Sequence, residues 1–218
     1  MKKIIAMIVL LFIALIGFLV YQVNEKTTQD KMYAEATVFF QEEDYKKAIQ
    51  FFEEVAEHHN LFSGRLKTDL SYYQAEAHMK LGEYEEALSI YDALIEGGSK
   101  DNIPYVMKAY CLIGMDEEKS AAAVYKKGYE KTKDAKFLYY LANQYITMEQ
   151  YEDASDIIHR YQNIKDEEVL RELAFLEIVL YEKQQEYAKA FEIAKAFCEK
   201  YPEDEAGQKE KTFLESRQ

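Results

Sequence analysis

The hydrophobic pattern begins with an unbroken apolar run near the start of the chain. Residues 4–21, IIAMIVLLFIALIGFLVY, contain no charged side chain. At about 1.5 Å per residue, a helix over this run would extend for roughly 27 Å, close to the thickness of a bilayer's hydrocarbon core. The run is longer than the apolar part of a typical cleaved signal peptide, and no pair of small residues follows it as a cleavage site. It therefore predicts an uncleaved transmembrane anchor, with a cleaved signal peptide as the alternative.

Charges on the two sides of this run predict its orientation. Lys2 and Lys3 precede it, whereas Glu25, Lys26 and Asp30 follow it. Positively charged flanks stay on the cytoplasmic side of a membrane. We therefore expect a single-pass protein of the plasma (inner) membrane, with a cytoplasmic N-terminus and the rest of the chain outside the cytoplasm.

The rest of the chain repeats a pattern of paired small residues. Within each pair the two residues are twelve positions apart, and successive pairs are separated by 39, 34, 33 and 36 positions. A large apolar residue follows four positions after the second member of most pairs. Such a unit predicts two short amphipathic helices joined by a tight turn, with the small residues where the helices cross. The pairs are Ala36 with Ala48, Ala75 with Ala87, Ala109 with Ala121, Ala142 with Ala154, and Ile178 with Ala190.

On these residues the chain resembles the tetratricopeptide repeat family, whose 34-residue unit carries small residues at its eighth and twentieth positions. Pro202 falls at position 32 of the fifth unit, where the family has a closing proline. The chain departs from the pattern in having no tryptophan, and Ile178 replaces the first small residue of the fifth unit. An unrelated helical bundle is the alternative, but it has no reason to repeat with this period.

The resemblance implies an all-α fold, an α-α superhelix of about five helix-turn-helix repeats after an N-terminal transmembrane helix. A single repeat cannot bury its own apolar faces, so the repeats stack and the end of the stack needs a cap. The expected division is a cytoplasmic tip and anchor at 1–23, a short linker at 24–28, repeats at 29–67, 68–101, 102–134, 135–170 and 171–204, and a C-terminal capping helix at 205–218.

Composition and net charge exclude some classes of chain and of binding partner. The chain is 49% apolar and 31% charged, an ordinary globular composition that excludes a disordered chain. Its formal net charge is −13. Phosphate binding needs a basic face, so we expect no nucleic acid partner. The negative charge favours partners with basic residues around apolar anchors.

Candidate catalytic and metal-binding residues form no strong motif. The histidines are His58, His59, His78 and His159; Glu54 and His58 are one helical turn apart, but no third ligand follows at zinc spacing. We expect His78 to be a hydrogen-bonded histidine of the interior. Cys111 and Cys198 lie in different repeats and are expected to be small buried residues rather than a disulfide. No enzymatic activity, cofactor or metal is therefore expected.

In the resembled family the first helix of each repeat lines a concave surface through its positions 2, 5, 9 and 12. Here those positions are rich in aromatic and aliphatic residues, and tyrosine is suited to interfaces because it combines wide apolar area with a hydroxyl. Further residues at these positions include Ile103, Lys136, Ile146, Glu172 and Glu182. The candidate partner-binding groove comprises Tyr33, Tyr72, Val106, Tyr110, Tyr139, Asn143 and Phe175.

The sequence therefore predicts a membrane-anchored scaffold that binds a protein or peptide segment through this aromatic groove, in envelope protein assembly or secretion. The alternative is a structural component that self-associates to organise an envelope complex. A homo-oligomer would be expected in the second case.

Overall fold

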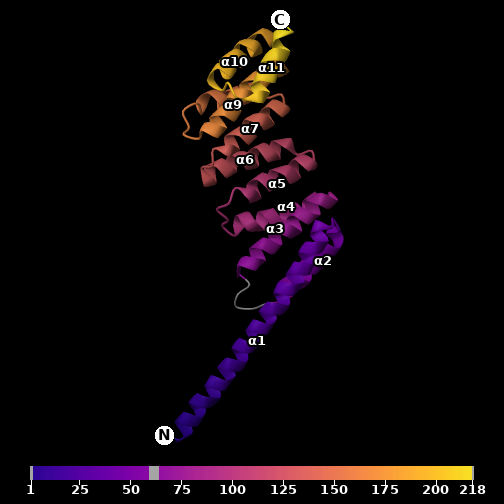
Figure 1. Ribbon diagram of the computed structural model, residues 1–218, viewed down its shortest axis with the longest axis vertical. Helices are drawn as coiled ribbons and strands as arrows, with labels where there is room; N and C mark the ends of the chain where they lie inside the picture. The colour runs from indigo at the N-terminus through magenta and orange to yellow at the C-terminus, as the bar shows by residue number, and fades with distance from the viewer. Residues whose placement is uncertain (1, 59–63, 218) are drawn as a thin grey trace. The chain divides into compact units, whose positions relative to one another are not determined.

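The structure, a computed structural model, describes residues 2–58 and 64–217, with the side chains of 7–58 and 66–217. These residues form eleven helices and no strand, which confirms the all-α prediction (Figure 1). The helices are α1 (Lys2–Gln41), α2 (Tyr45–Glu57), α3 (Gly64–Leu81), α4 (Tyr84–Glu96), α5 (Ile103–Gly114), α6 (Glu118–Thr132), α7 (Lys136–Thr147), α8 (Tyr151–Arg160), α9 (Glu167–Lys183), α10 (Tyr187–Lys200) and α11 (Glu205–Glu215).

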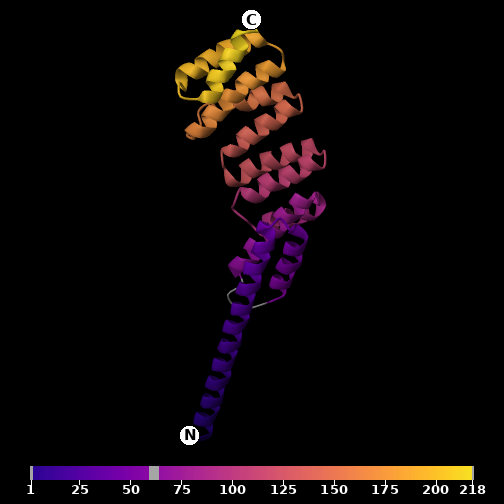
Figure 2. The same ribbon diagram turned by 45° about the vertical axis from the view of Figure 1, so that its right-hand side comes forward.

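The chain divides into two compact units. The N-terminal unit, Met1–Gly98, holds α1 to α4, and the C-terminal unit, Ser99–Gln218, holds α5 to α11. Inside each unit every helix packs against the next one in the chain, and α7 also contacts α9. In Figures 1 and 2 the pairs α3 with α4, α5 with α6, α7 with α8 and α9 with α10 are antiparallel helices joined by tight turns. This arrangement of local pairs is that of a helical-repeat solenoid.

The paired small residues of the sequence lie where the two helices of each repeat meet. All ten of them have no exposed surface. The pairs belong to α1 with α2, α3 with α4, α5 with α6, α7 with α8, and α9 with α10, which are packed pairs of helices. Nine of the ten are alanines, whose methyl side chain lets two backbones approach closely, so the apolar residues around them can close a core.

Each turn between the two helices of a repeat places one residue in the left-handed region, with φ between 58° and 77°. This residue always precedes the second small residue of its repeat by five positions. Its N–H bonds to the carbonyl three residues back, and the next N–H bonds to the carbonyl five residues back, which is the Schellman pattern at a helix end. Only the second repeat has glycine there; the five residues are Glu43, Gly82, Asp116, Glu149 and Gln185.

Residues 24–28, the expected short linker, lie within α1, which continues through them without a break. The segment contains no glycine or proline to end a helix. A salt bridge between Lys26 and Asp30, 2.9 Å long and one turn apart, adds local support. The same helix therefore carries the apolar run and the first helix of the first repeat.

Two polar contacts fix α1 to the end of α2 just after the apolar run. The buried Gln29 amide donates hydrogen bonds to the carbonyls of Val55 (3.1 Å) and His58 (2.6 Å). The His58 Nδ1 atom lies 3.0 Å from the Glu25 carboxylate. The Gln29 amide thus supplies donors at the end of α2, where helix carbonyls lack the N–H of a following turn, and the Val55 carbonyl also accepts from the His58 N–H.

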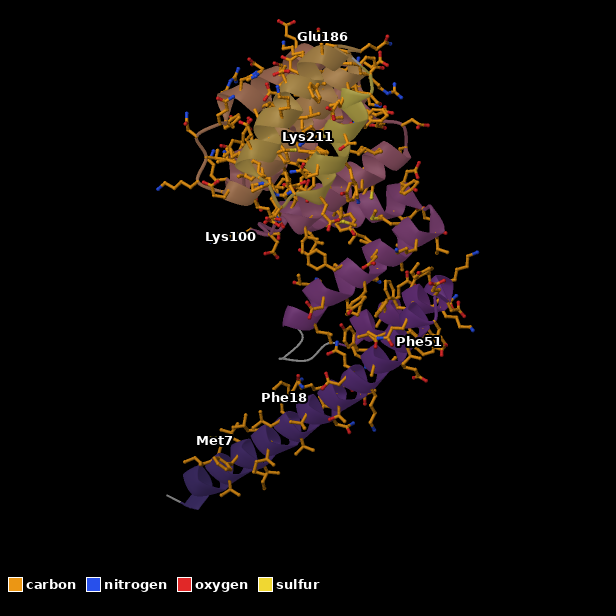
Figure 3. The ribbon with its side chains drawn as sticks, turned by 45° about the horizontal axis from the view of Figure 1, so that its top comes forward. Met7, Phe18, Phe51, Lys100, Glu186 and Lys211 are labelled. Carbon is orange, nitrogen blue, oxygen red and sulfur yellow. The ribbon has the colours of Figure 1, made fainter. Side chains whose placement is uncertain are left out.

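The apolar half of α1 lies outside the core. The large apolar side chains from Met7 to Val23 are 45% to 67% exposed. Figure 3 shows the side chains of Met7 and Phe18 projecting from α1 with no other helix beside them. Within the described residues, α1 is the helix long and apolar enough to cross a membrane, and its position near the N-terminus also suits a signal sequence.

The last helix, α11, covers the end of the C-terminal unit. Its N-cap residue Asp204 accepts a hydrogen bond from the Gly207 N–H at 2.9 Å and pairs with Arg171. A Cβ at Gly207 would meet the Phe197 ring at 2.4 Å, so glycine permits the close approach of α11 to α10. Leu214 completes the contact with no exposed surface.

The turn geometry predicts opposite effects for one substitution made at two nearby places. Glu149→Gly should raise the free energy of unfolding by up to about 1 kcal/mol, because glycine enters the left-handed region without the steric cost of a Cβ. Glu152→Gly, three residues on and exposed in the first turn of α8, should lower it by about 0.5–1 kcal/mol. Denaturant unfolding measures both. Equal destabilisation by the two changes would contradict the turn assignment.

Candidate partner-binding surface

The seven residues predicted to line the groove are all at least partly exposed. Tyr33 and Tyr72 belong to the N-terminal unit, and the other five belong to the C-terminal unit. Those five lie on α5, α7 and α9, the first helices of the third, fourth and fifth repeats. We call the side of the C-terminal unit formed by Ile103, Val106, Tyr110, Tyr139 and Asn143 with Glu172 and Phe175 the first-helix face.

Tyr33 contributes mainly to packing in the N-terminal unit. Its ring lies 6.2 Å from the Phe52 ring and 6.0 Å from the Tyr73 ring, measured between centroids. Burial, with the charge and hydrogen bond of Tyr73, raises the pKa of Tyr33 to about 12. Tyr33 is therefore part of an aromatic cluster, and Tyr72 of the same unit is likewise half-buried.

The most exposed aromatic residue of the first-helix face is Tyr110, at 43%. Near it the Tyr140 ring stacks on Tyr125 at 5.4 Å and meets Tyr139 edge-on at 5.7 Å. Burial is the main cause that raises the pKa of each of these three hydroxyls, and the charge of Tyr110 adds to it in all three. The four hydroxyl groups are therefore gathered in one region of the face.

Tyr140 was missed by sequence reasoning because it occupies the sixth position of its repeat, outside the positions used to list the groove. The alternation of buried and exposed residues along α7 gives no signal that separates it from a core residue. Conversely, Ile146 occupies one of the positions that line the concave surface in the resembled family, but it is only 4% exposed. It packs in the core between α7, α8 and α9, because a branched apolar side chain at the end of α7 reaches the neighbouring repeat.

A carboxylate lies beside the tyrosines. Burial, and next the charge of Glu168, raise the pKa of Glu172, although Lys136 and Arg171 act in the opposite direction. The charge of Glu172 in turn raises the pKa of Tyr139 and Tyr140. Lys136 itself pairs with Glu168 at 3.8 Å. The first-helix face thus combines aromatic rings with a half-buried negative charge.

Phe175 and Asn143 have different surroundings. The Phe175 ring packs edge-on against Phe197 at 5.7 Å, so one side of it belongs to the core of the last repeat. Asn143 is exposed on α7, and its amide is available for a hydrogen bond to a partner's backbone. Val106 is half-buried on α5 and adds aliphatic surface.

The histidines take part in contacts between neighbouring elements. His78 lies half-buried with its Nδ1 atom 2.8 Å from Glu83, which agrees with the expected hydrogen-bonded interior histidine. His58 pairs with Glu25 rather than with Glu54. His59 lies outside the described residues.

His159 forms a hydrogen-bonded chain that the sequence did not suggest. Its Nδ1 atom is 3.0 Å from the Ser155 hydroxyl, and its Nε2 atom is 3.0 Å from the Glu177 carboxylate. The order serine, histidine, acid is that of a hydrolytic triad. However, Ser155 lies inside α8, where the backbone N–H groups are used by the helix and cannot stabilise an oxyanion. These hydrogen bonds of His159 instead join α8 to α9.

Among the described residues, no three histidine, cysteine or acidic side chains are grouped to hold a metal ion. Cys111 and Cys198 are both free and buried, as expected. Burial raises the pKa of Cys111 to about 11, so its thiol stays protonated and unreactive.

At the C-terminal end of the unit, Glu182 of α9 is coupled to Glu210 of α11. Burial, followed by the hydrogen bond and the charge of Glu210, raises the pKa of Glu182 to about 7, against the opposing charges of Arg217 and Lys183. One buried oxygen of Glu210 has no hydrogen-bond partner. Glu182 therefore keeps its proton to near neutral pH, because burial and the neighbouring Glu210 carboxylate disfavour its charged form.

Comparisons with known proteins agree with this architecture. Models of the tetratricopeptide repeat family match residues 33–102 and 175–204. No curated protein matches the chain. A tetratricopeptide repeat protein from Parabacteroides merdae has a similar structure, with 16% identity, a TM-score of 0.66, and coverage of 86% of this chain and 72% of that one.

Two further solved structures are similar. YrrB, described as a TPR protein with an unusual peptide-binding site, has 13% identity and a TM-score of 0.55, covering 83% of this chain and 90% of that one. MamA from Desulfovibrio magneticus has 18% identity and a TM-score of 0.58, covering 81% of this chain and 97% of that one. At these identities the likeness establishes the fold.

The Glu182 and Glu210 pair predicts a pH effect on stability. The folded chain binds a proton on Glu182 between its ordinary pKa of 4.5 and about 7, so this group's contribution to stability is present at low pH and is lost as pH rises through that window. Glu182→Gln imitates the protonated form. Its unfolding free energy relative to the unmodified chain should therefore increase from pH 5 to pH 8, as measured by denaturant unfolding.

The matched control is Glu192→Gln, because Glu192 is exposed on α10 and pairs with Lys195 of the same helix. It should show no such trend. A difference for Glu182→Gln that stays constant over the pH range would contradict the raised pKa of Glu182.

Proposed function

The chain belongs to the tetratricopeptide repeat family, and from that premise we propose that it is a membrane-anchored scaffold. In this proposal it binds a protein or peptide segment through the aromatic concave groove of its repeats, and it serves protein assembly or secretion at the cell envelope. The family supports a role in protein interaction, since stacked repeats present extended surfaces to partners.

The observation that carries the proposal is the exposure of Tyr110 beside Tyr139 and Tyr140 on the first-helix face. Aromatic side chains that a solenoid needs for stability are buried between its helices, as Tyr91 and Tyr125 are. Tyr110 is 43% exposed and forms no ring contact or hydrogen bond within the described part of the chain. Exposed tyrosine on a rigid surface is the residue type that anchors partners at interfaces.

The groove's remaining members support the same use. Val106 adds aliphatic surface, and Asn143 offers an amide to a partner's backbone. In the N-terminal unit, Tyr72 and the packed Tyr33 are the aromatic residues that we propose for partner contact. The peptide-binding site named for YrrB belongs to that protein, and it supports peptide recognition here by analogy of fold.

The apolar half of α1 supports the membrane anchor. Its exposed side chains would bury in hydrocarbon, and its helix satisfies its own backbone hydrogen bonds as a membrane requires. With Lys2 and Lys3 retained in the cytoplasm, the repeats lie outside it in the plasma (inner) membrane.

We expect the full-length chain to stay with membranes after washing in alkaline carbonate, because that treatment releases proteins held only by surface charge. Protease added to spheroplasts should digest the repeats and spare the first residues. Release by carbonate would contradict the anchor, and protection of the repeats would reverse the proposed orientation.

Removal of two aromatic side chains tests the groove. Tyr110→Ala combined with Tyr139→Ala should abolish recovery of the partners that affinity-tagged, detergent-solubilised chain retains, since a central aromatic anchor contributes about 2 kcal/mol or more. The helical circular-dichroism signal should be unchanged because neither residue is fully buried.

Tyr161→Ala is the matched control. Tyr161 follows α8 and contacts Tyr129 of α6 at 5.5 Å, so the variant loses a tyrosine and a ring contact away from the first-helix face. Partners should still be recovered with it. Recovery that survives the double change in a folded chain would place the binding surface elsewhere.

A further inference from the structure

The first-helix face has a local charge arrangement that the overall acidity of the chain does not explain. Lys136 of α7 pairs with Glu168 of α9 at 3.8 Å, and Tyr140 and Glu172 each follow one of these residues by one helical turn on the same two packed helices. Tyr140 and its neighbour Tyr139 therefore lie beside the Glu172 carboxylate, which agrees with its effect on the pKa of both hydroxyls. The exposed Tyr110 acts on the same two hydroxyls and completes a group of Tyr110, Tyr139, Tyr140 and Glu172. We call this group the tyrosine corner. The face of an aromatic ring carries negative potential, so rings and carboxylate here have the same electrostatic sign.

The cations nearest the tyrosine corner are already paired. Lys136 lies 3.8 Å from Glu168. Arg171 pairs with Asp204, the N-cap residue of α11. Within the described part of the chain, no hydrogen bond or ion pair engages Glu172, while its half-buried position raises its pKa. A half-buried carboxylate without a partner loses hydration that nothing replaces.

A ligand cation would compensate this carboxylate and contact the rings together. Tyr110 is 43% exposed and has no ring packed on it, so its surface is accessible to a ligand. A planar guanidinium stacks on an aromatic face and bonds a carboxylate through two N–H groups, whereas an ammonium offers a point charge. The arrangement therefore suits arginine better than lysine, and it opposes an acidic ligand or a free carboxylate.

We propose that the tyrosine corner receives a positively charged side chain, arginine in preference to lysine, from the segment bound on the first-helix face. This inference rests on the proposed function, and it adds the chemistry by which the partner is selected. The apolar neighbours Ile103 and Val106 would then contact the residues beside that side chain.

The test uses two short peptides that differ in charge alone. The probes are acetyl-Phe-Arg-Leu-amide and the same peptide with citrulline, which keeps the shape of arginine without its charge. The full chain, solubilised in a nonionic detergent and labelled with ¹³C in its tyrosine rings, is titrated with each peptide and followed by NMR. The signals of Tyr110, Tyr139 and Tyr140 are assigned by Tyr→Phe substitution.

We expect the arginine peptide to shift these three signals saturably, with an affinity at least tenfold higher than that of the citrulline peptide. Glu172→Gln should reduce the affinity for the arginine peptide about tenfold and leave the citrulline peptide unchanged. Glu192→Gln, a distant exposed substitution, is the control and should change neither.

Three outcomes would overturn the proposal: equal affinities for the two peptides, no shift of these signals by the arginine peptide, or binding of tetramethylammonium as tight as that of the arginine peptide. The last would mean that a free small cation, and not a peptide side chain, is preferred. None of these outcomes changes what is expected for recovery of partners after Tyr110→Ala with Tyr139→Ala. Failure of cation binding at the tyrosine corner can therefore be distinguished from failure of the proposed function.

Discussion

The close approach of the two helices in each repeat is the contact on which the rest of the structure depends. Ten small or branched residues with no exposed surface occupy the crossings. A left-handed turn residue, always five positions before the second of each pair, brings the second helix back against the first. Because one such hairpin cannot bury all its apolar surface, it must pack on its neighbours, and the core becomes a series of local contacts.

This way of building a core leaves part of the first helices free. In the C-terminal unit, α7 contacts α6, α8 and α9, which uses its apolar residues from Phe137 to Ile146. Tyr139 and Asn143 remain on the side that these contacts do not cover. Side chains on that side can therefore be chosen for a partner rather than for stability, which is how a rigid repeat array combines a stable core with a variable binding surface.

The repeats, their register and the burial of the small residues could be predicted from the sequence, because a fixed spacing of twelve reflects one local geometry that is repeated. The continuity of α1 through residues 24–28 was not predicted, because the boundary between anchor and repeats was placed by dividing the chain into parts and not by helix propensity. Contacts between residues far apart in the sequence could not be predicted either. Glu25 and His58 are 33 positions apart and meet only because α2 folds back along α1.

The candidate surface was predicted less completely for a related reason. Family positions identify which helix face is used, but the side chain's length and its neighbours decide whether a residue stays exposed. Ile146 packs in the core against α8 and α9. Tyr140, one residue after a listed position, stacks on Tyr125 and belongs to the tyrosine corner. Glu172 was at a listed position, but its lack of a partner follows from the pairing of Lys136 and Arg171 with other groups.

The central claim is that partners bind on the first-helix face, and site-specific photocrosslinking in intact membranes tests it most directly. The photoreactive residue p-benzoylphenylalanine is placed at Tyr110 on α5 or at Lys127, which is exposed on α6 of the same unit. Irradiation should give a crosslinked product of defined mass from position 110 and none from position 127. A product from position 127 alone would show that partners contact the opposite side of the unit, and it would contradict the account.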